Sequence, residues 1–267
     1  MNTKNPSEPL RVGVLPLARP TFDVPYAEQI CKDAWKLMEQ IPVDWIGSSD
    51  LLFDTKSVES QLSKFKKEHL DLLLILQMTF TDASMTVKLA ETFDVPLLFW
   101  SFPEKRTGGR LRLNSLCGVN LAAHALGKSG IQCDYINLNP QDPETQDELA
   151  SWIRAFQTRK NLSSTKIAVI GEHPDGFHTC SFDSNKLMDI TGVTVKQIEL
   201  PELFNEADKI TIDTVAEARS QLDLQINGLD QVEQDPLEKS IRILSALRRK
   251  AEKEGYKGFS IRCWPEF

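Results

Sequence analysis

The stretch LDLLLIL at residues 70–76 decides the fold, together with VPLLFW at residues 95–100. Both runs are almost entirely apolar instead of alternating apolar with polar residues, which is typical of parallel strands buried on both faces. Residues 82–93 lie between them and show helical periodicity. The pattern predicts a strand–helix–strand unit in a parallel sheet that helices cover on both sides.

The same alternation continues outward from this unit in both directions. Asp54 precedes an amphipathic segment and is expected to be its helix N-cap. Toward the N-terminus we expect strands at 11–17 and 43–46 and helices at 24–40 and 54–68, and toward the C-terminus a helix at 116–129 and a strand at 134–138. These elements predict a doubly wound α/β domain.

The pattern restarts after a join at residues 140–165, where a turn at 140–143 is followed by a polar helix at 144–158 and a loop at 161–165. Beyond it we expect strands at 166–171, 193–199 and 258–264 and helices at 183–191 and 237–255. The sequence therefore predicts two tandem Rossmann-like domains with parallel sheets, at residues 1–160 and 161–267. Because the chain stops on an expected buried strand, we expect the second domain to be truncated at its C-terminal end.

Composition excludes several classes of protein. The formal net charge of the 267 residues is −7, which argues against binding to nucleic acid or to an anionic membrane. No apolar run approaches the length of about 20 residues that a membrane span needs, and the N-terminus lacks the apolar region of a secretory signal. The five cysteines have no CxxC spacing, which favours reduced thiols in a cytoplasmic protein over disulfides or a zinc site.

The ends of the predicted strands are rich in hydroxyl, amide and charged side chains and poor in pairs of nucleophile and base. Such groups suit a polyhydroxylated ligand such as a sugar, which many directional hydrogen bonds hold. Residues 171–176 can equally form only a tight turn, and residues 107–110 only a loop. There is no G-x-G-x-x-G or G-x-S-x-G motif, and His173 and His178 are too few for a metal site.

Several stretches share their order and spacing with one family: residues 19–23 after the first strand, 113–120 leading into a helix, 167–177, 192–195 and 198–200 in the second domain, and 261–267 at the end. Together they resemble the N-terminal and central domains of the L-fucose isomerase/L-arabinose isomerase superfamily. The resemblance covers nearly the whole chain.

That resemblance implies a ketol isomerisation of a pentose or 6-deoxyhexose through an ene-diol. In such a reaction Mn²⁺ or a similar divalent ion polarises the carbonyl while carboxylates move the proton. The family binds its metal through a Glu, an Asp and a His. By position Glu266 is the Glu, as a catalytic and metal-ligating residue, although it can also be a solvated terminal carboxylate. The other two motifs are not in this chain, so we expect it not to hold the metal stably and to be inactive alone.

The family also builds its site between subunits, which implies a homo-oligomer and makes Arg19, Ser115, Cys117 and Asn120 candidate contacts to the sugar or to a neighbouring subunit. Two alternatives stay open. One is a sugar-binding module without catalysis, against which the absence of a signal peptide and of a helix-turn-helix segment counts. The other is a fragment that makes only subunit contacts.

Overall fold

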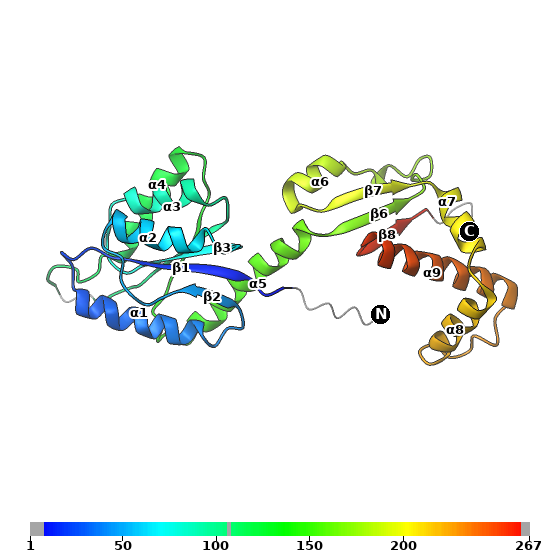
Figure 1. The fold of residues 1–267 in the computed structure, drawn as a ribbon, viewed down its shortest axis with the longest axis horizontal. Coiled ribbons are helices and arrows are strands. Elements are labelled where there is room, and N and C mark those ends of the chain that lie inside the picture. The colour runs from blue at the N-terminus through cyan, green and yellow to red at the C-terminus, as the bar shows by residue number, and fades with distance from the viewer. Residues whose placement is uncertain (1–7, 106–107, 263–267) are drawn as a thin grey trace. The chain divides into compact units, whose positions relative to one another are not determined.

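A computed structural model describes residues 8–105 and 108–262. The chain divides into two compact units, Met1–Lys160 and Asn161–Phe267, and each is described by itself. The predicted α/β class with parallel sheets is confirmed in both (Figure 1). No helix within the described ranges has both the length and the apolar character to cross a membrane.

The first unit is built on a parallel sheet of five strands in the order β2-β1-β3-β4-β5. The two apolar runs that predicted the fold form its central strands, β3 and β4, and every residue of both strands is buried. The strand bounds are β1 (Arg11–Leu17), β2 (Asp44–Gly47), β3 (Leu72–Gln77), β4 (Leu97–Ser101) and β5 (Asp134–Asn137).

Helices cover both faces of this sheet, as Figure 1 shows. Alternate residues of β1 take opposite sides: Val12 and Val14 pack with α1 (Val24–Met38) and α5 (Thr145–Ser163). Leu15 and Leu17 pack with the helices of the other face, because side chains alternate along a strand. Those helices are α2 (Thr55–Phe65), α3 (Ser84–Thr92) and α4 (Ser115–Lys128).

The predicted helix start at Asp54 is confirmed. Its carboxylate accepts a hydrogen bond of 2.7 Å from the Ser57 backbone N–H. In return, the Asp54 backbone N–H donates to the Ser57 hydroxyl at 3.3 Å. This reciprocal pair satisfies two backbone donors that the first turn of a helix leaves without partners.

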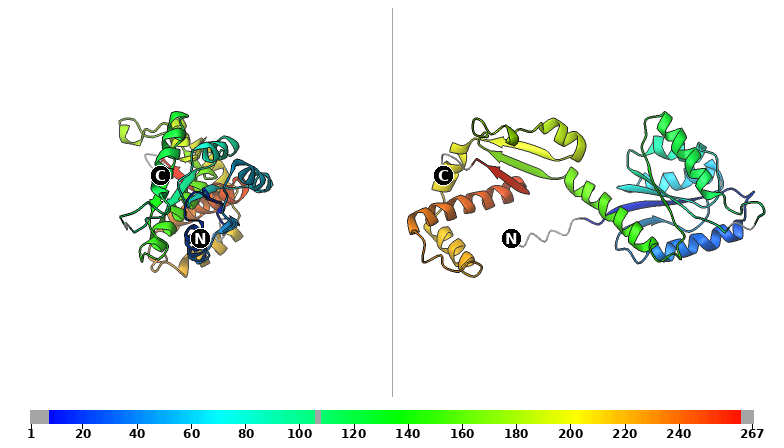
Figure 2. Two further views of the ribbon diagram at one scale, coloured as in Figure 1. Left: turned by 90° about the vertical axis from the view of Figure 1, so that its left-hand side faces the viewer. Right: turned by 180° about the vertical axis from the view of Figure 1, so that it is seen from behind.

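The second unit has a parallel sheet of three strands in the order β7-β6-β8. One face of this sheet packs against α7 and α9 in an apolar core that includes Ala168, Ile170 and Leu203. The views in Figure 2 show α9 running along the three strands. The bounds are β6 (Lys166–Ile170), α6 (Ser184–Thr191), β7 (Thr194–Ile198), α7 (Leu200–Asp208), α8 (Ile212–Asp223), α9 (Gln234–Glu254) and β8 (Gly258–Ile261).

The structure shifts several predicted boundaries by a few residues and adds elements that were not predicted. The loop predicted at 161–165 is wrong over residues 161–163, because α5 continues to Ser163. These three residues are exposed, so no buried apolar residue marks the last turn of the helix. Helices α7 and α8 were not predicted. Pro201 in the first turn of α7 and the Thr211 N-cap of α8 are the local signals that mark them.

Candidate functional site

The strand order of the first unit reverses direction at β1 and β3. The chain passes from β1 to β2 on one side and then returns to β3 on the other side of β1. In open parallel sheets, ligands bind beyond the carboxyl ends of the strands at such a switch point. The loops that follow β1 and β3 meet there, since the Arg19 N–H donates to Thr79 Oγ1 at 2.8 Å and the Met78 N–H to the Leu17 carbonyl at 2.9 Å.

Aromatic rings from the two loops pack together at this edge. The centroids of Phe22 and Phe80 are 6.3 Å apart. The Arg19 guanidinium carbon lies 6.0 Å from the Phe80 centroid, and the same guanidinium pairs with the Asp82 carboxylate. Hydrogen bonds from Ser84, and then the charge of Arg19, lower the pKa of Asp82, so Asp82 is ionised at neutral pH.

A third loop closes the edge, and the structure describes its residues 102–105 and 108–114. The Glu104 carboxylate fixes it by accepting hydrogen bonds from the backbone N–H groups of Arg112 at 2.6 Å, Leu113 at 3.0 Å and Asn114 at 2.8 Å. The loop ends where α4 begins, and N–H groups at such a position favour a carboxylate. Glu104 therefore acts on the shape of the loop, a role that its place in the sequence did not reveal.

Two arginines of this loop reach back to the loop after β1. Arg110 Nη2 donates to the Thr21 carbonyl at 3.1 Å, and its guanidinium carbon lies 5.3 Å from the Phe22 centroid. Arg112 Nε donates to Asp23 Oδ2 at 2.8 Å, and this bond lowers the pKa of Asp23. The Arg112 guanidinium carbon also lies 3.8 Å from the Tyr26 centroid. We call Arg19, Phe22, Tyr26, Phe80, Arg110 and Arg112 the arginine–aromatic cluster.

The site residues predicted from the sequence lie in different surroundings in the structure. Arg19 lies in the arginine–aromatic cluster. Cys117 and Asn120 are both exposed and stand three residues apart on α4, so they share one side of that helix. Ser115 is buried, with 2% of its surface exposed. Glu266 lies outside the described residues.

Ser115 belongs to a buried polar network beneath the edge. Its hydroxyl accepts from the Phe102 N–H at 3.0 Å and donates to the Gln77 carbonyl. The Gln77 side chain in turn donates to the Thr79 carbonyl at 2.7 Å and to Thr81 Oγ1 at 3.0 Å. These bonds tie the ends of β3 and β4 to the start of α4, so Ser115 holds the edge in shape from below.

The second unit carries a pocket of about 920 Å³ on the sheet face opposite its core. Ile167 and Val169 of β6 form part of its floor, since they alternate with the core residues Ala168 and Ile170. The other lining residues come from the segment after β6, from α6, from β7 and from the end of β8: Gly171, Glu172, His173, Pro174, Phe177, Cys180, Ser181, Phe182, Leu187, Val195, Gln197, Ser260, Ile261 and Arg262.

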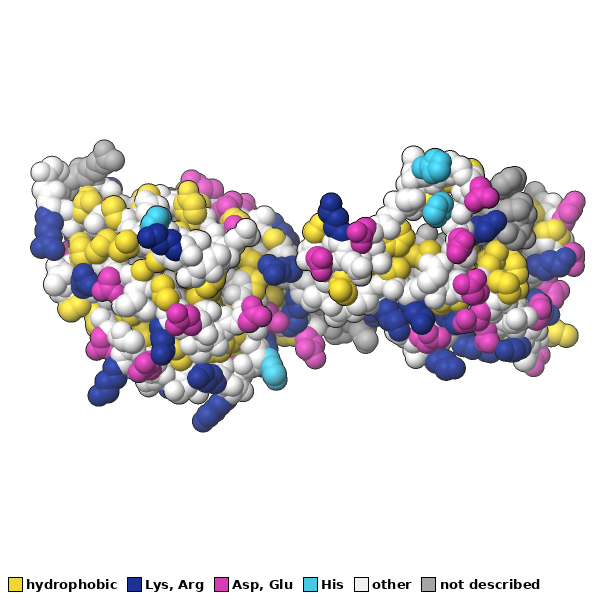
Figure 3. Space-filling model, turned by 90° about the horizontal axis from the view of Figure 1, so that it is seen from above, with side chains coloured by type: hydrophobic (Ala, Val, Ile, Leu, Met, Phe, Trp, Pro, Cys, Tyr) yellow, Lys and Arg dark blue, Asp and Glu magenta, His cyan; other side chains and the backbone are white. Residues whose placement is uncertain are grey.

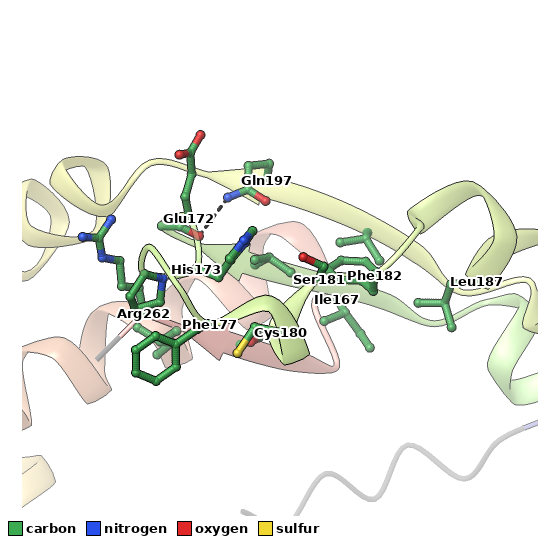
Figure 4. Close-up of a pocket in the computed structure, with 16 residues that line it drawn as sticks. Ile167, Glu172, His173, Phe177, Cys180, Ser181, Phe182, Leu187, Gln197 and Arg262 are labelled. Atoms are coloured by element: carbon green, nitrogen blue, oxygen red, sulfur yellow. Dashed lines mark hydrogen bonds between the residues drawn. The ribbon is translucent and has the colours of Figure 1, made fainter. Parts of the chain in front are cut away.

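Polar groups gather at the strand ends of this pocket (Figure 4). Gln197 Nε2 donates to the Gly171 carbonyl at 3.0 Å and so fixes the first turn of the loop. In the close-up the His173 ring lies near Gln197, whereas the Glu172 carboxylate points away from the other labelled side chains. An apolar floor with a few polar groups at one end suits a small polar molecule.

The described residues do not fit a bound Mn²⁺ ion. Across residues 8–105 and 108–262 there is no group of three or more His, Cys, Asp and Glu side chains that could hold a metal. A divalent ion of this kind prefers about six oxygen or nitrogen ligands. His173 and His178 are therefore not part of a metal-binding group within the described residues.

Comparison with known proteins identifies relatives along nearly the whole chain. The model of the fucose/sulfoquinovose isomerase N-terminal domain matches residues 13–163. The sulfoquinovose isomerase of Alkalicoccus urumqiensis is 28% identical over 262 residues, which cover 97% of this chain and 58% of the relative. That of Priestia megaterium (strain ATCC 12872 / QMB1551) is 27% identical over 253 residues, covering 95% and 56%. The chain thus spans little more than half the length of these relatives.

Proposed function

This chain belongs to the fucose/sulfoquinovose isomerase family, and from that premise we propose that it contributes the N-terminal and central domains of an aldose–ketose isomerase that acts on a 6-deoxyhexose. Two observations together support the proposal: the family match over residues 13–163 and the polar edge at the switch point of the sheet. The sulfoquinovose isomerases among its relatives make sulfoquinovose, a 6-deoxyhexose with a sulfonate on carbon 6, the first substrate to test.

In this proposal the described residues bind and orient the sugar. The first unit offers guanidinium and carboxylate groups at the edge above β1 and β3, which can donate to and accept from the hydroxyl groups of a polyol. Isomerisation through a metal-stabilised ene-diol, with Glu266 as one metal ligand, follows from the family resemblance. Since the described residues present no ligand set, we propose that turnover requires ligands from other residues, and that a homo-oligomer supplies a neighbouring subunit to the site.

The test compares this chain alone with a chimera in which the C-terminal remainder of the Alkalicoccus relative follows residue 267. Conversion of sulfoquinovose to its ketose is followed by NMR with Mn²⁺ present. We expect turnover by the chimera and none by the chain alone. Turnover by the isolated chain would contradict the requirement for further ligands, and an inactive, folded chimera would contradict the isomerase assignment.

Sugar binding without catalysis is the alternative function, and the pocket of about 920 Å³ in the second unit is the observation that favours it. Calorimetric titration of the chain with sulfoquinovose and with L-fucose, each with and without Mn²⁺, separates the two. Micromolar binding that does not depend on the metal, together with an inactive chimera, would favour the binding module.

A further inference from the structure

We propose that Arg110 and Arg112, beside Arg19, form an anion site that receives the sulfonate, or another tetrahedral oxyanion, on carbon 6 of the sugar. This inference rests on the proposed function, because it names the part of the substrate that the first unit recognises. Ketol isomerisation changes carbons 1 and 2, so a site for carbon 6 acts at the end of the sugar remote from the reaction.

The place of the cluster favours ligand binding. Arg19 and Phe22 follow β1, and Phe80 follows β3, so they flank the switch point where parallel sheets bind their ligands. Arg110 and Arg112 come from the loop that Glu104 holds over the same edge. Two loops therefore bring guanidinium groups to one location, and the loop after β3 adds the Phe80 ring beside Arg19 and Phe22.

The guanidinium planes are held ready for an anion. The Arg112 guanidinium carbon lies 3.8 Å from the Tyr26 centroid, and that of Arg110 lies 5.3 Å from the Phe22 centroid. Contact with an aromatic face orients a guanidinium and leaves its N–H edge for other partners. An arginine that is oriented in advance loses less conformational freedom when it binds a sulfonate or phosphate through paired hydrogen bonds.

Across the part of the chain that the structure describes, the guanidinium groups of the cluster are not all paired with carboxylates. Asp82 pairs with Arg19 and Asp23 pairs with Arg112. Arg110 donates to a neutral carbonyl, and within the described residues it has no carboxylate partner. The Glu104 carboxylate on the same loop accepts from backbone N–H groups, so among residues 8–105 and 108–262 the Arg110 guanidinium is left without a paired carboxylate, next to the Phe22 ring.

The unpaired guanidinium is a local feature of the surface. On the face drawn in Figure 3, Lys and Arg side chains are interspersed with Asp and Glu over the described surface, and the whole chain carries a formal net charge of −7. A small positive site on an acidic protein suits a small ligand with one anionic group. It does not suit a polyanion, which needs an extended basic surface.

Calorimetric titration of this chain tests the site without requiring catalysis. The probes are sulfoquinovose, 6-deoxyglucose as its neutral analogue, and glucose 6-phosphate. We expect sulfoquinovose to bind at least about tenfold more tightly than 6-deoxyglucose, the factor that about 1.4 kcal/mol from one charge-assisted hydrogen bond gives. Comparison with glucose 6-phosphate shows whether the site takes a sulfonate in particular or either oxyanion.

Arg110→Gln is the decisive variant, because it removes the unpaired guanidinium and its bond to a carbonyl. We expect it to weaken binding of sulfoquinovose far more than binding of 6-deoxyglucose and so to abolish most of the preference for the sulfonate, with Arg110→Lys intermediate. Arg154→Gln is the matched control, since Arg154 is an exposed arginine on α5 outside the cluster. An unaltered far-ultraviolet circular dichroism spectrum checks that each variant is folded.

Equal binding of the sulfonated and neutral sugars by the wild-type chain, no binding of sulfoquinovose, or a preference that survives Arg110→Gln would each overturn the site. A different result would contradict the isomerase assignment and leave the anion site standing. In that case the chimera is inactive, but the chain still binds sulfoquinovose more tightly than 6-deoxyglucose, and this preference is lost in Arg110→Gln. An active chimera in which Arg110→Gln leaves KM for sulfoquinovose unchanged would overturn the site and leave the isomerase assignment standing.

Discussion

The Arg112 guanidinium carbon lies 3.8 Å from the centroid of the Tyr26 ring. The Arg112 backbone carbonyl also accepts from the N–H of Asp23, the residue that caps the start of α1. The loop before α4 is thereby fastened to the first turn of α1, although the two segments are 89 positions apart in sequence. This fastening sets the shape of the candidate site, and the loop that makes it depends in turn on Glu104.

Replacing Glu104 with alanine removes the acceptor of three backbone N–H groups. We expect Glu104→Ala to lower the free energy of unfolding of the first unit by about 1 kcal/mol, as the loss of a helix N-cap does. Glu104→Gln keeps one oxygen acceptor and should lose less. Urea denaturation measures both, and an unchanged midpoint for Glu104→Ala would show that the carboxylate does not fix the loop.

Gly118 on α4 has no room for a side chain. A Cβ atom there would lie 2.8 Å from Nε2 of the buried Gln77 side chain and 3.0 Å from its Cδ, so Gly118→Ala forces a shift in the polar network beneath the site. We expect a loss of roughly 1–3 kcal/mol in the free energy of unfolding, as for other overpacked sites.

Gly127 on the same helix is the matched control for that substitution. A Cβ atom at Gly127 would meet nothing within 4 Å, and alanine favours the helix over glycine by roughly 0.5–1 kcal/mol. Gly127→Ala is therefore expected to be neutral or stabilising in the same urea titration. Equal effects of the two substitutions would contradict the close approach of α4 to Gln77.

The cysteines should differ sharply in reactivity. Burial raises the pKa of Cys31 to about 12, so at pH 8 almost none of it is the reactive thiolate. Cys117 and Cys180 are exposed. Iodoacetamide followed by mass spectrometry should label Cys117 and Cys180 in the folded chain and Cys31 only after addition of denaturant. Rapid labelling of Cys31 in the native chain would show that the first unit opens readily.

The α2 cap should make stability depend on pH in a defined direction. Hydrogen bonds from Ser57 lower the pKa of Asp54 below its usual value of 3.8. A carboxylate with a lowered folded-state pKa contributes stability above its unfolded-state pKa, and the contribution disappears as pH falls through the folded-state value. The difference in urea midpoint between wild type and Asp54→Ala should therefore be full at pH 6 and shrink below pH 4.

Asp54→Asn provides the control for this titration, since asparagine caps a helix without ionising. The difference in urea midpoint between Asp54→Asn and Asp54→Ala should change much less between pH 6 and pH 3 than the difference between wild type and Asp54→Ala. A wild-type advantage over Asp54→Ala that persists at pH 2 would mean that the cap does not depend on the charge of Asp54.

The local sequence predicted those strands and helices whose buried positions are occupied by a clear pattern of apolar residues. The apolar residues of 72–76 and 97–100 are buried throughout, so a continuous apolar run was a sufficient signal. The end of α5 escaped prediction because its residues 161–163 are exposed. Helices α7 and α8 escaped prediction because few of their residues, such as Leu203 and Ala218, are buried.

The sequence by itself determined the α/β class, the parallel strands and the family to which the chain belongs, because these depend on patterns within short segments and on their order. It pointed to Arg19 through the family resemblance. Only the tertiary structure decided that Arg110 and Arg112 join Arg19, that Glu104 shapes their loop and that Ser115 is buried beneath it. The physical reason is that strand order brings the ends of distant strands to one edge, and no short segment of sequence encodes which strands become neighbours.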